Sequence, residues 1–189
     1  SHLDRSKNPL PGSSQPNSRG GDTWDYANTN YKDHFAEHYM KALDKPETLG
    51  LPDVANLNPE GYLFPATYEV PPGTTATQLL KQMVKKTLDV AKSLDIDTRA
   101  KALGYTGEEI LTIASILEYE AKKDEDYPKV ARVLYNRLAK PMRLQLDSTV
   151  SYVSQRKGDV FTTPEERADP SKYNTYTNDG LPPGPIGSP

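Results

Sequence analysis

The sequence of 189 residues contains no cysteine, which excludes a disulfide framework, a thiol nucleophile and cysteine-ligated zinc. Hydrophobic residues make up only 35 % of the chain, and its apolar runs extend for a few residues, too short to span a bilayer. We therefore expect these residues themselves to be soluble. Charge of neither sign dominates, because 23 Lys and Arg stand against 26 Asp and Glu. Nucleic acid is excluded as a partner on this basis, since phosphate binding needs a concentrated positive surface.

Residues 1–22 have few apolar side chains and are dense in Ser, Pro, Gly and Asn. Such a segment cannot offset its ordering entropy by burial, so we expect a flexible, disordered tail. Residues 23–189 are expected to form one domain of class α+β, rich in helices and with a small antiparallel sheet. The aromatic, β-branched segment 61–70, which Pro and Gly residues bound, is predicted to be a strand or an extended segment.

Apolar residues that recur every three or four positions predict five helices. A capping box of Thr106 and Glu109 marks the start of one of them. A second begins near Thr74 or Thr75, and Asp147 is a plausible N-cap for a third. The five predicted ranges are 31–43, about 75–94, 107–123, about 128–140 and a short helix from 147 through 153.

The helix predicted at 107–123 carries two carboxylates near its end, Glu118 and Glu120. On a helical wheel Glu120 falls within the apolar arc, and Glu118 falls at the edge of that arc. A carboxylate in a desolvated cleft holds its proton near neutral pH, as a general acid requires. The competing interpretation is an ordinary acidic residue that pairs with Arg132 or Arg137.

Further polar residues gather downstream, in the segments 135–137, 145–149 and 173–176. Tyr accounts for 12 of the 15 aromatic residues in the chain. Aromatic side chains with a polar end are suited to a wet cleft that binds a sugar polymer. Taken singly, each of these residues has another explanation: Asn136 and Asp147 as caps, Arg137 in a surface ion pair, the tyrosines as packing.

His34 and His38 flank Glu37 in the H-x-x-E-H pattern of inverted zinc peptidases. The helical spacing suits two metal ligands, but no third ligand is evident. Two solvated histidines on an amphipathic helix explain the pattern better, so no metal is expected.

Six motifs in order resemble the endolytic murein transglycosylases, the YceG-like family. They are 60–68 (EGYLFPATY), 114–120 (ASILEYE), 133–138 (VLYNRL), 142–150 (MRLQLDSTV), 173–176 (YNTY) and 180–186 (GLPPGPI). The resemblance implies lytic cleavage of the β-1,4 bond between N-acetylmuramic acid and N-acetylglucosamine in nascent peptidoglycan glycan, leaving 1,6-anhydro ends. It assigns catalysis to Glu120 alone, with no cofactor. It also implies that these residues line or support the glycan site: Glu118, Asn136, Arg137, Gln145, Asp147, Tyr173, Asn174 and Tyr176.

Members of this family begin with a membrane-spanning helix and an N-terminal module, and they continue beyond Ile186. The resemblance therefore implies an extracytoplasmic, membrane-anchored parent protein, penicillin-binding synthases as partners, and a catalytic domain truncated at its C-terminus. A non-catalytic peptidoglycan-binding or scaffolding module is the alternative function, and a zinc peptidase is the less favoured one. A hydrolase would need a second carboxylate, for which Asp147 is the candidate.

Overall fold

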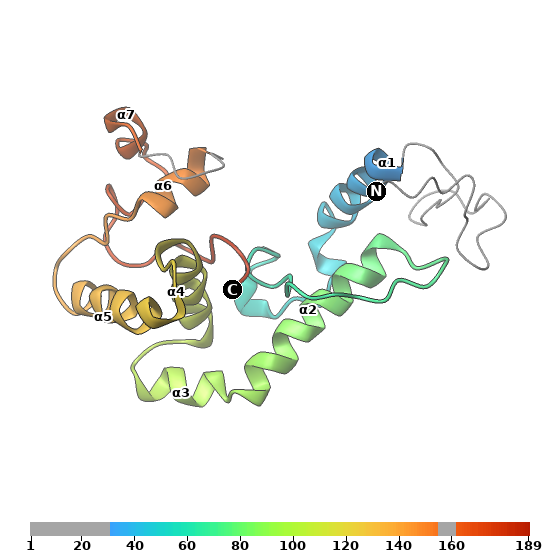
Figure 1. The fold of residues 1–189 in the computed structure, drawn as a ribbon, viewed down its shortest axis with the longest axis horizontal. Coiled ribbons are helices and arrows are strands. Elements are labelled where there is room, and N and C mark those ends of the chain that lie inside the picture. Colours follow the sequence, from blue (N-terminus) through green and yellow to red (C-terminus); the bar gives the residue numbers. More distant parts are fainter. Residues whose placement is uncertain (1–30, 155–161) are drawn as a thin grey trace. The chain divides into compact units, whose positions relative to one another are not determined.

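The computed structural model describes residues 31–154 and 162–189, with side chains from residue 37 onward. The tail expected at 1–22 lies outside the described residues. The helices, with short 3-10 turns marked η, are α1 Tyr31–Leu43, η1 Pro46–Thr48, η2 Asp53–Ala55, α2 Ala76–Ser93, α3 Ile96–Ala102, α4 Gly107–Glu120, η3 Asp124–Asp126, α5 Tyr127–Leu138, α6 Asp147–Ser154 and α7 Pro164–Arg167 (Figure 1). None of the helices in the described part is long and apolar enough to cross a membrane.

The expected antiparallel sheet is absent from the described residues, so the α+β assignment is wrong and the described fold is helical. The segment 61–70 contains no strand, and its residues Gly61 and Tyr62 each contact a different part of the chain. Gly61 adopts a left-handed φ of +84°, and a Cβ there would lie 2.5 Å from Pro185 Cβ. Tyr62 is buried and its hydroxyl donates to the Glu108 carboxylate. Gly61 and Tyr62 are therefore held by the C-terminal segment and by α4, and not by a neighbouring strand.

The described chain divides into two compact units, one of residues 31–59 and 65–88, the other of residues 60–64, 89–154 and 162–189. In the first unit, α2 presents Leu79, Leu80 and Val84 as a buried stripe, as its periodicity predicts. The predicted stripe extended to Leu94, but α2 ends at Ser93 and Leu94 is exposed.

In the second unit, α4 packs against α3, α5 and α6, and α6 packs against α7 (Figure 1). The predicted capping box begins α4: the Thr106 hydroxyl accepts from the Glu109 amide, and the Glu109 side chain accepts from the Thr106 amide. The core of this unit combines α4, α5 and two non-helical segments through Ile113, Ile116, Leu134, Leu144 and Ile186.

Ser115 joins the C-terminal segment to α4 inside this core. Its Oγ accepts from the Ile186 amide at 3.0 Å and donates to the Thr112 carbonyl oxygen at 2.8 Å. Ser115 is fully buried, so no water can replace it as a partner for Ile186.

We expect Ser115→Ala to lower the free energy of unfolding by about 1–3 kcal/mol, because it leaves the buried Ile186 amide without an acceptor. Urea unfolding followed by circular dichroism measures the change. Ser93→Ala is the matched control, since its exposed hydroxyl bonds only to the Val90 carbonyl oxygen. Equal unfolding midpoints for the two variants would contradict the expectation.

Candidate active site

Glu120 is the last residue of α4 and is half-buried. It follows the fully buried Ile116 by one turn, so it continues the inner face of the helix as the wheel predicts. Its Oε1 lies 3.4 Å from the amide nitrogen of Ser148, near the start of α6. The end of α4 and the beginning of α6 therefore meet at this carboxylate.

Asp147, the first residue of α6, accepts two hydroxyl groups. Tyr176 and Thr162 each donate to its Oδ1 at 2.7 Å. Arg167 Nε lies 3.7 Å from the same oxygen and donates to Thr162 Oγ1 at 2.7 Å, while its guanidinium lies over the Tyr176 ring, 5.2 Å from the centroid. Asp147 is thus a bound acceptor at the centre of a polar cluster.

The electrostatics of Tyr176 connect this cluster to Glu120. Burial raises the pKa of Tyr176, as do its hydrogen bond to Asp147 and the charges of Asp147 and Glu120, whereas the Arg167 cation opposes the rise. A negative charge beside a phenol disfavours the phenolate. Tyr176 is therefore kept neutral between two carboxylates and is a hydrogen-bond donor in the site.

The segment 173–178 is fixed to the start of α6 through buried hydroxyls. Thr175 Oγ1 lies 2.9 Å from Thr149 Oγ1 and accepts from the Leu146 amide at 2.9 Å. Asn174, also buried, donates through Nδ2 to the carbonyl oxygens of Arg167 and Asp169 at 3.1 and 2.8 Å. These contacts place Tyr176 against Asp147.

Arg137 and Gln145 contact the chain that leads into α6. The half-buried Arg137 donates from Nη1 to the Leu144 carbonyl oxygen. Gln145 is exposed, adopts a left-handed φ of 52°, and donates its amide to the Thr175 carbonyl oxygen at 3.1 Å. Arg137 therefore stabilises the backbone that precedes Asp147. The left-handed φ of Gln145 turns the chain just before Asp147.

Three other predicted site residues, Glu118, Asn136 and Tyr173, have different surroundings. Glu118 is exposed and accepts from the Tyr127 hydroxyl at 2.9 Å, so it is held at the start of α5. Asn136 is exposed on α5. Tyr173 is half-buried and packs its ring against Tyr152, with centroids 4.9 Å apart.

The sequence patterns missed four residues that build this site: Ser148, Thr162, Arg167 and Thr175. Thr175 stood within the 173–176 motif, where its buried hydroxyl had no distinguishing signal. Arg167 ends α7, whose capping box of Thr163 and Glu166 is readable in the sequence. Ser148 Oγ is the one buried side-chain polar atom without a hydrogen-bond partner in the described part of the chain.

Among the described residues, no three His, Cys, Asp or Glu side chains converge as metal ligands. The side chain of His34, on which the zinc hypothesis depends, lies outside those residues.

We expect Asp147→Asn to lower the pKa of Tyr176, because it removes a negative charge that opposes the phenolate while Arg167 remains. Nuclear magnetic resonance titration of the chain labelled at tyrosine Cζ follows this group, and Tyr176→Phe assigns its signal. Asp126→Asn, which changes an exposed ion pair with Lys129, is the control. A pKa that stays or rises in Asp147→Asn would refute the role given to Asp147.

The sequence profile of the YceG-like family matches residues 18–189. An endolytic murein transglycosylase of Bacillus subtilis is 39 % identical over 157 residues, covering 79 % of this chain and 42 % of that protein. Its counterpart in Streptococcus pneumoniae R6 is 41 % identical over 134 residues, covering 69 % and 24 %.

The structural comparison agrees with the sequence comparison. A YceG-like protein of Listeria monocytogenes, solved by crystallography, superposes with a TM-score of 0.68 at 37 % identity, over 80 % of this chain and 53 % of that one. The chain spans less than half the length of the curated relatives that it matches. The profile match and these identities show that the chain belongs to the YceG-like family.

Proposed function

We propose that this chain carries the catalytic residues of an endolytic murein transglycosylase, with Glu120 as the acid and base of the reaction. The observation that carries the proposal is the position of Glu120 beside the Ser148 amide and within electrostatic range of Tyr176. The names and identities of the relatives support the same activity. The proposed substrate is peptidoglycan glycan, at the bond between N-acetylmuramic acid and N-acetylglucosamine.

The proposed reaction begins when the protonated Glu120 gives its proton to the glycosidic oxygen. The bond from that oxygen to C1 of the muramic acid breaks, and C1 develops oxocarbenium character. Glu120, now a carboxylate, accepts the proton of the 6-hydroxyl of the same sugar. The 6-oxygen then bonds to C1 and closes a 1,6-anhydro ring, so no water is consumed.

The contacts of Asp147 favour this lytic route over hydrolysis. A hydrolase needs a second carboxylate as base or nucleophile. Asp147 Oδ1 instead accepts from Tyr176 and Thr162 and lies beside the Arg167 cation. An intramolecular hydroxyl has a proximity advantage over water, so one carboxylate that acts first as acid and then as base suffices.

The other residues of the site have proposed roles that follow from their contacts. Tyr176, kept neutral, donates its one hydroxyl hydrogen to Asp147 and is proposed to border the reacting sugar. Arg137 and Asn174 support the backbone that carries Asp147 and Tyr176. Gln145 and Asn136, both exposed, are proposed to contact the glycan from the edge of the site. We keep Glu118 as a supporting residue through its bond to Tyr127.

An extracytoplasmic location and an association with wall-synthesis enzymes belong to the same proposal. The location follows from the substrate, because peptidoglycan lies outside the cell membrane, and the association is what the resemblance to the family implies. In-cell crosslinking from an exposed position of the chain would identify such partners.

We expect Glu120→Gln to reduce glycan cleavage by about 10²–10⁴-fold, the usual contribution of general acid–base catalysis. Digested peptidoglycan is examined by mass spectrometry before and after borohydride reduction. Products of the parent chain should be one water lighter than hydrolytic fragments and unreactive toward borohydride.

Glu125→Gln is the matched control, because it makes the same change on an exposed carboxylate that lies 3.9 Å from Lys123 Nζ and has no role in the proposed site. Full cleavage by Glu120→Gln would overturn the assignment of Glu120. Products with reducing ends would indicate a hydrolase. Glycan retention without cleavage by the parent chain would indicate a non-catalytic binding module.

A further inference from the structure

The side-chain hydroxyl of Ser148 differs from the other hydroxyls near the start of α6. Its Oγ is buried and has no hydrogen-bond partner in the described part of the chain. By contrast, Thr149 Oγ1 donates to a backbone carbonyl oxygen at 2.7 Å. Thr162 and Tyr176 each donate to Asp147, also at 2.7 Å. Burying a hydroxyl without a partner is unfavourable, so such an exception beside a site requires an explanation.

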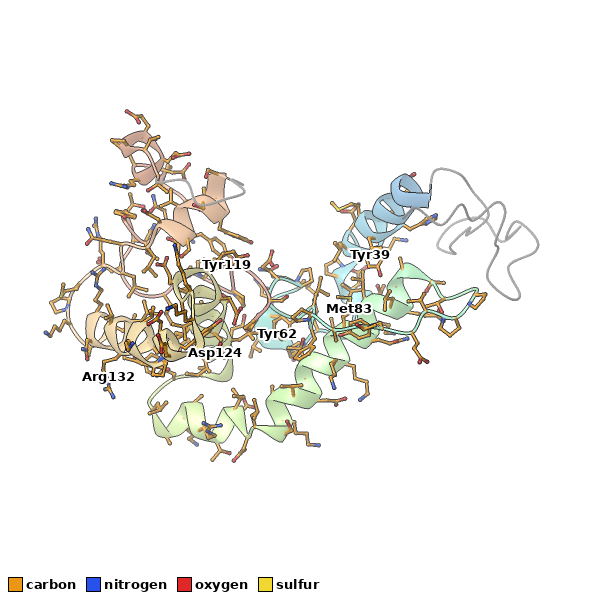
Figure 2. All side chains as sticks on the ribbon, viewed as in Figure 1. Tyr39, Tyr62, Met83, Tyr119, Asp124 and Arg132 are labelled. Atoms are coloured by element: carbon orange, nitrogen blue, oxygen red, sulfur yellow. The ribbon has the colours of Figure 1, made fainter. Side chains whose placement is uncertain are left out.

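The position of Ser148 brings both of its donors to the end of the helix that meets Glu120. This end of α6 lies next to the end of α4 that Tyr119 marks in Figure 2, and the Ser148 amide nitrogen lies 3.4 Å from Glu120 Oε1. Ser148 is the second residue of α6, so its amide has no acceptor within the helix. The Cα–Cβ bonds of a helix tilt toward its N-terminus, so the Ser148 side chain leans toward the same end. Only the torsion χ1 separates its hydroxyl from its amide.

The Glu120 carboxyl needs a second donor to fix its orientation. Its contact with the Ser148 amide is longer than the usual N–H···O distance, which ends at about 3.2 Å. The other described residues make no hydrogen bond to either of its oxygens. The χ3 torsion of a glutamate has a broad minimum, so one long hydrogen bond leaves the carboxyl plane free to turn. A general acid acts efficiently only when its proton points at the oxygen that receives it.

We propose that Ser148 is a positioning residue for Glu120, and that its hydroxyl donates to Oε1, the oxygen that its amide already faces. The two donors of one residue then hold one carboxyl oxygen as an acceptor in both protonation states of Glu120. In the acid, the proton is therefore carried by Oε2, which is left to face the substrate. This role rests on the proposed function, because it orients Glu120 for the two proton transfers.

The assignment of the two oxygens of Glu120 specifies the path of the proton. The O–H bond at Oε2 breaks as the glycosidic oxygen gains the proton and releases C1. The 6-hydroxyl of the same sugar then returns a proton to Oε2 as the 6-oxygen bonds to C1. Oε1 accepts from Ser148 throughout. This hydrogen bond tightens as the first proton leaves, because a charged acceptor strengthens it.

Removal of the hydroxyl alone tests the positioning role in the cleavage reaction. We expect Ser148→Ala to lower kcat for glycan cleavage about tenfold, the equivalent of roughly 1.4 kcal/mol. KM should stay the same, because a buried hydroxyl that acts through Glu120 does not bind the glycan. The urea unfolding midpoint should not fall, because water can replace this donor at the half-buried Glu120.

A spectroscopic measurement tests the hydrogen bond without turnover. The chain is labelled with carbon-13 at glutamate Cδ, and Glu120→Gln assigns the carboxyl signal of Glu120 by its loss. We expect the chemical shift of this signal at neutral pH to change in Ser148→Ala and to stay the same in Ser154→Ala. Ser154 is the matched control, because it is an exposed serine of the same helix whose hydroxyl donates to the Ser151 carbonyl oxygen. Ser154→Ala should also cleave glycan with the kcat of the parent chain.

The outcomes separate the positioning role from the proposed function. An unchanged kcat in Ser148→Ala, with cleavage by the parent chain, would overturn the positioning role and leave the function in place. A lower kcat without a change in the Glu120 signal would also overturn it, because the hydroxyl would then act on another group. If the parent chain cleaves no glycan, the proposed function fails, and the Glu120 signal alone decides whether Ser148 holds this carboxyl.

Discussion

The hydrogen bonds of the Asp147 carboxylate are the interactions on which the rest of the site depends. Its Oδ1 accepts from hydroxyls that come from two different segments, and the Arg167 cation of α7 lies beside it. A hydrogen bond to a charged acceptor contributes more than a neutral one, and a shared acceptor couples its donors. The first residue of α6 therefore fixes where that helix starts, and the start of α6 presents the Ser148 amide to Glu120.

Buried hydroxyl groups extend this constraint into the core. Thr149 and Thr175 bond to each other and to backbone groups, and Ser115 joins the C-terminal segment to α4. Such groups give no hydrophobic driving force, but each specifies one partner at one distance. The apolar core stabilises the unit, whereas these pairs determine the register between α4, α6 and the segments that follow. A site made of short helices and irregular loops needs this kind of specification, because it has no sheet to supply it.

The sequence predicted those parts of the fold that local patterns determine. The helices α2, α4 and α5 followed from apolar spacing, and the start of α4 followed from the Thr106 capping box. The helix α3 was missed because its seven residues show no apolar stripe and follow Asp95 in a left-handed conformation. The composition of residues 61–70 predicts a strand or an extended segment, whereas the contact of Tyr62 with Glu108 joins positions far apart in sequence and leaves no local pattern. Likewise the wheel indicated Glu120, but the environment of Asp147 depends on three distant segments.

Asp147 transfers no proton in the proposed reaction, so the fold can use its carboxylate as a permanent hydrogen-bond acceptor. When the nucleophile is a hydroxyl of the substrate itself, no carboxylate is needed to activate water. A second carboxylate in the site is then free to accept hydrogen bonds permanently, and the positional order that it gives is useful to Glu120. A hydrolase on the same scaffold would need Asp147 released from Tyr176 and Thr162, and the contacts that position the start of α6 would be lost with it. The proposed mechanism with one carboxylate therefore leaves Asp147 to position the start of α6.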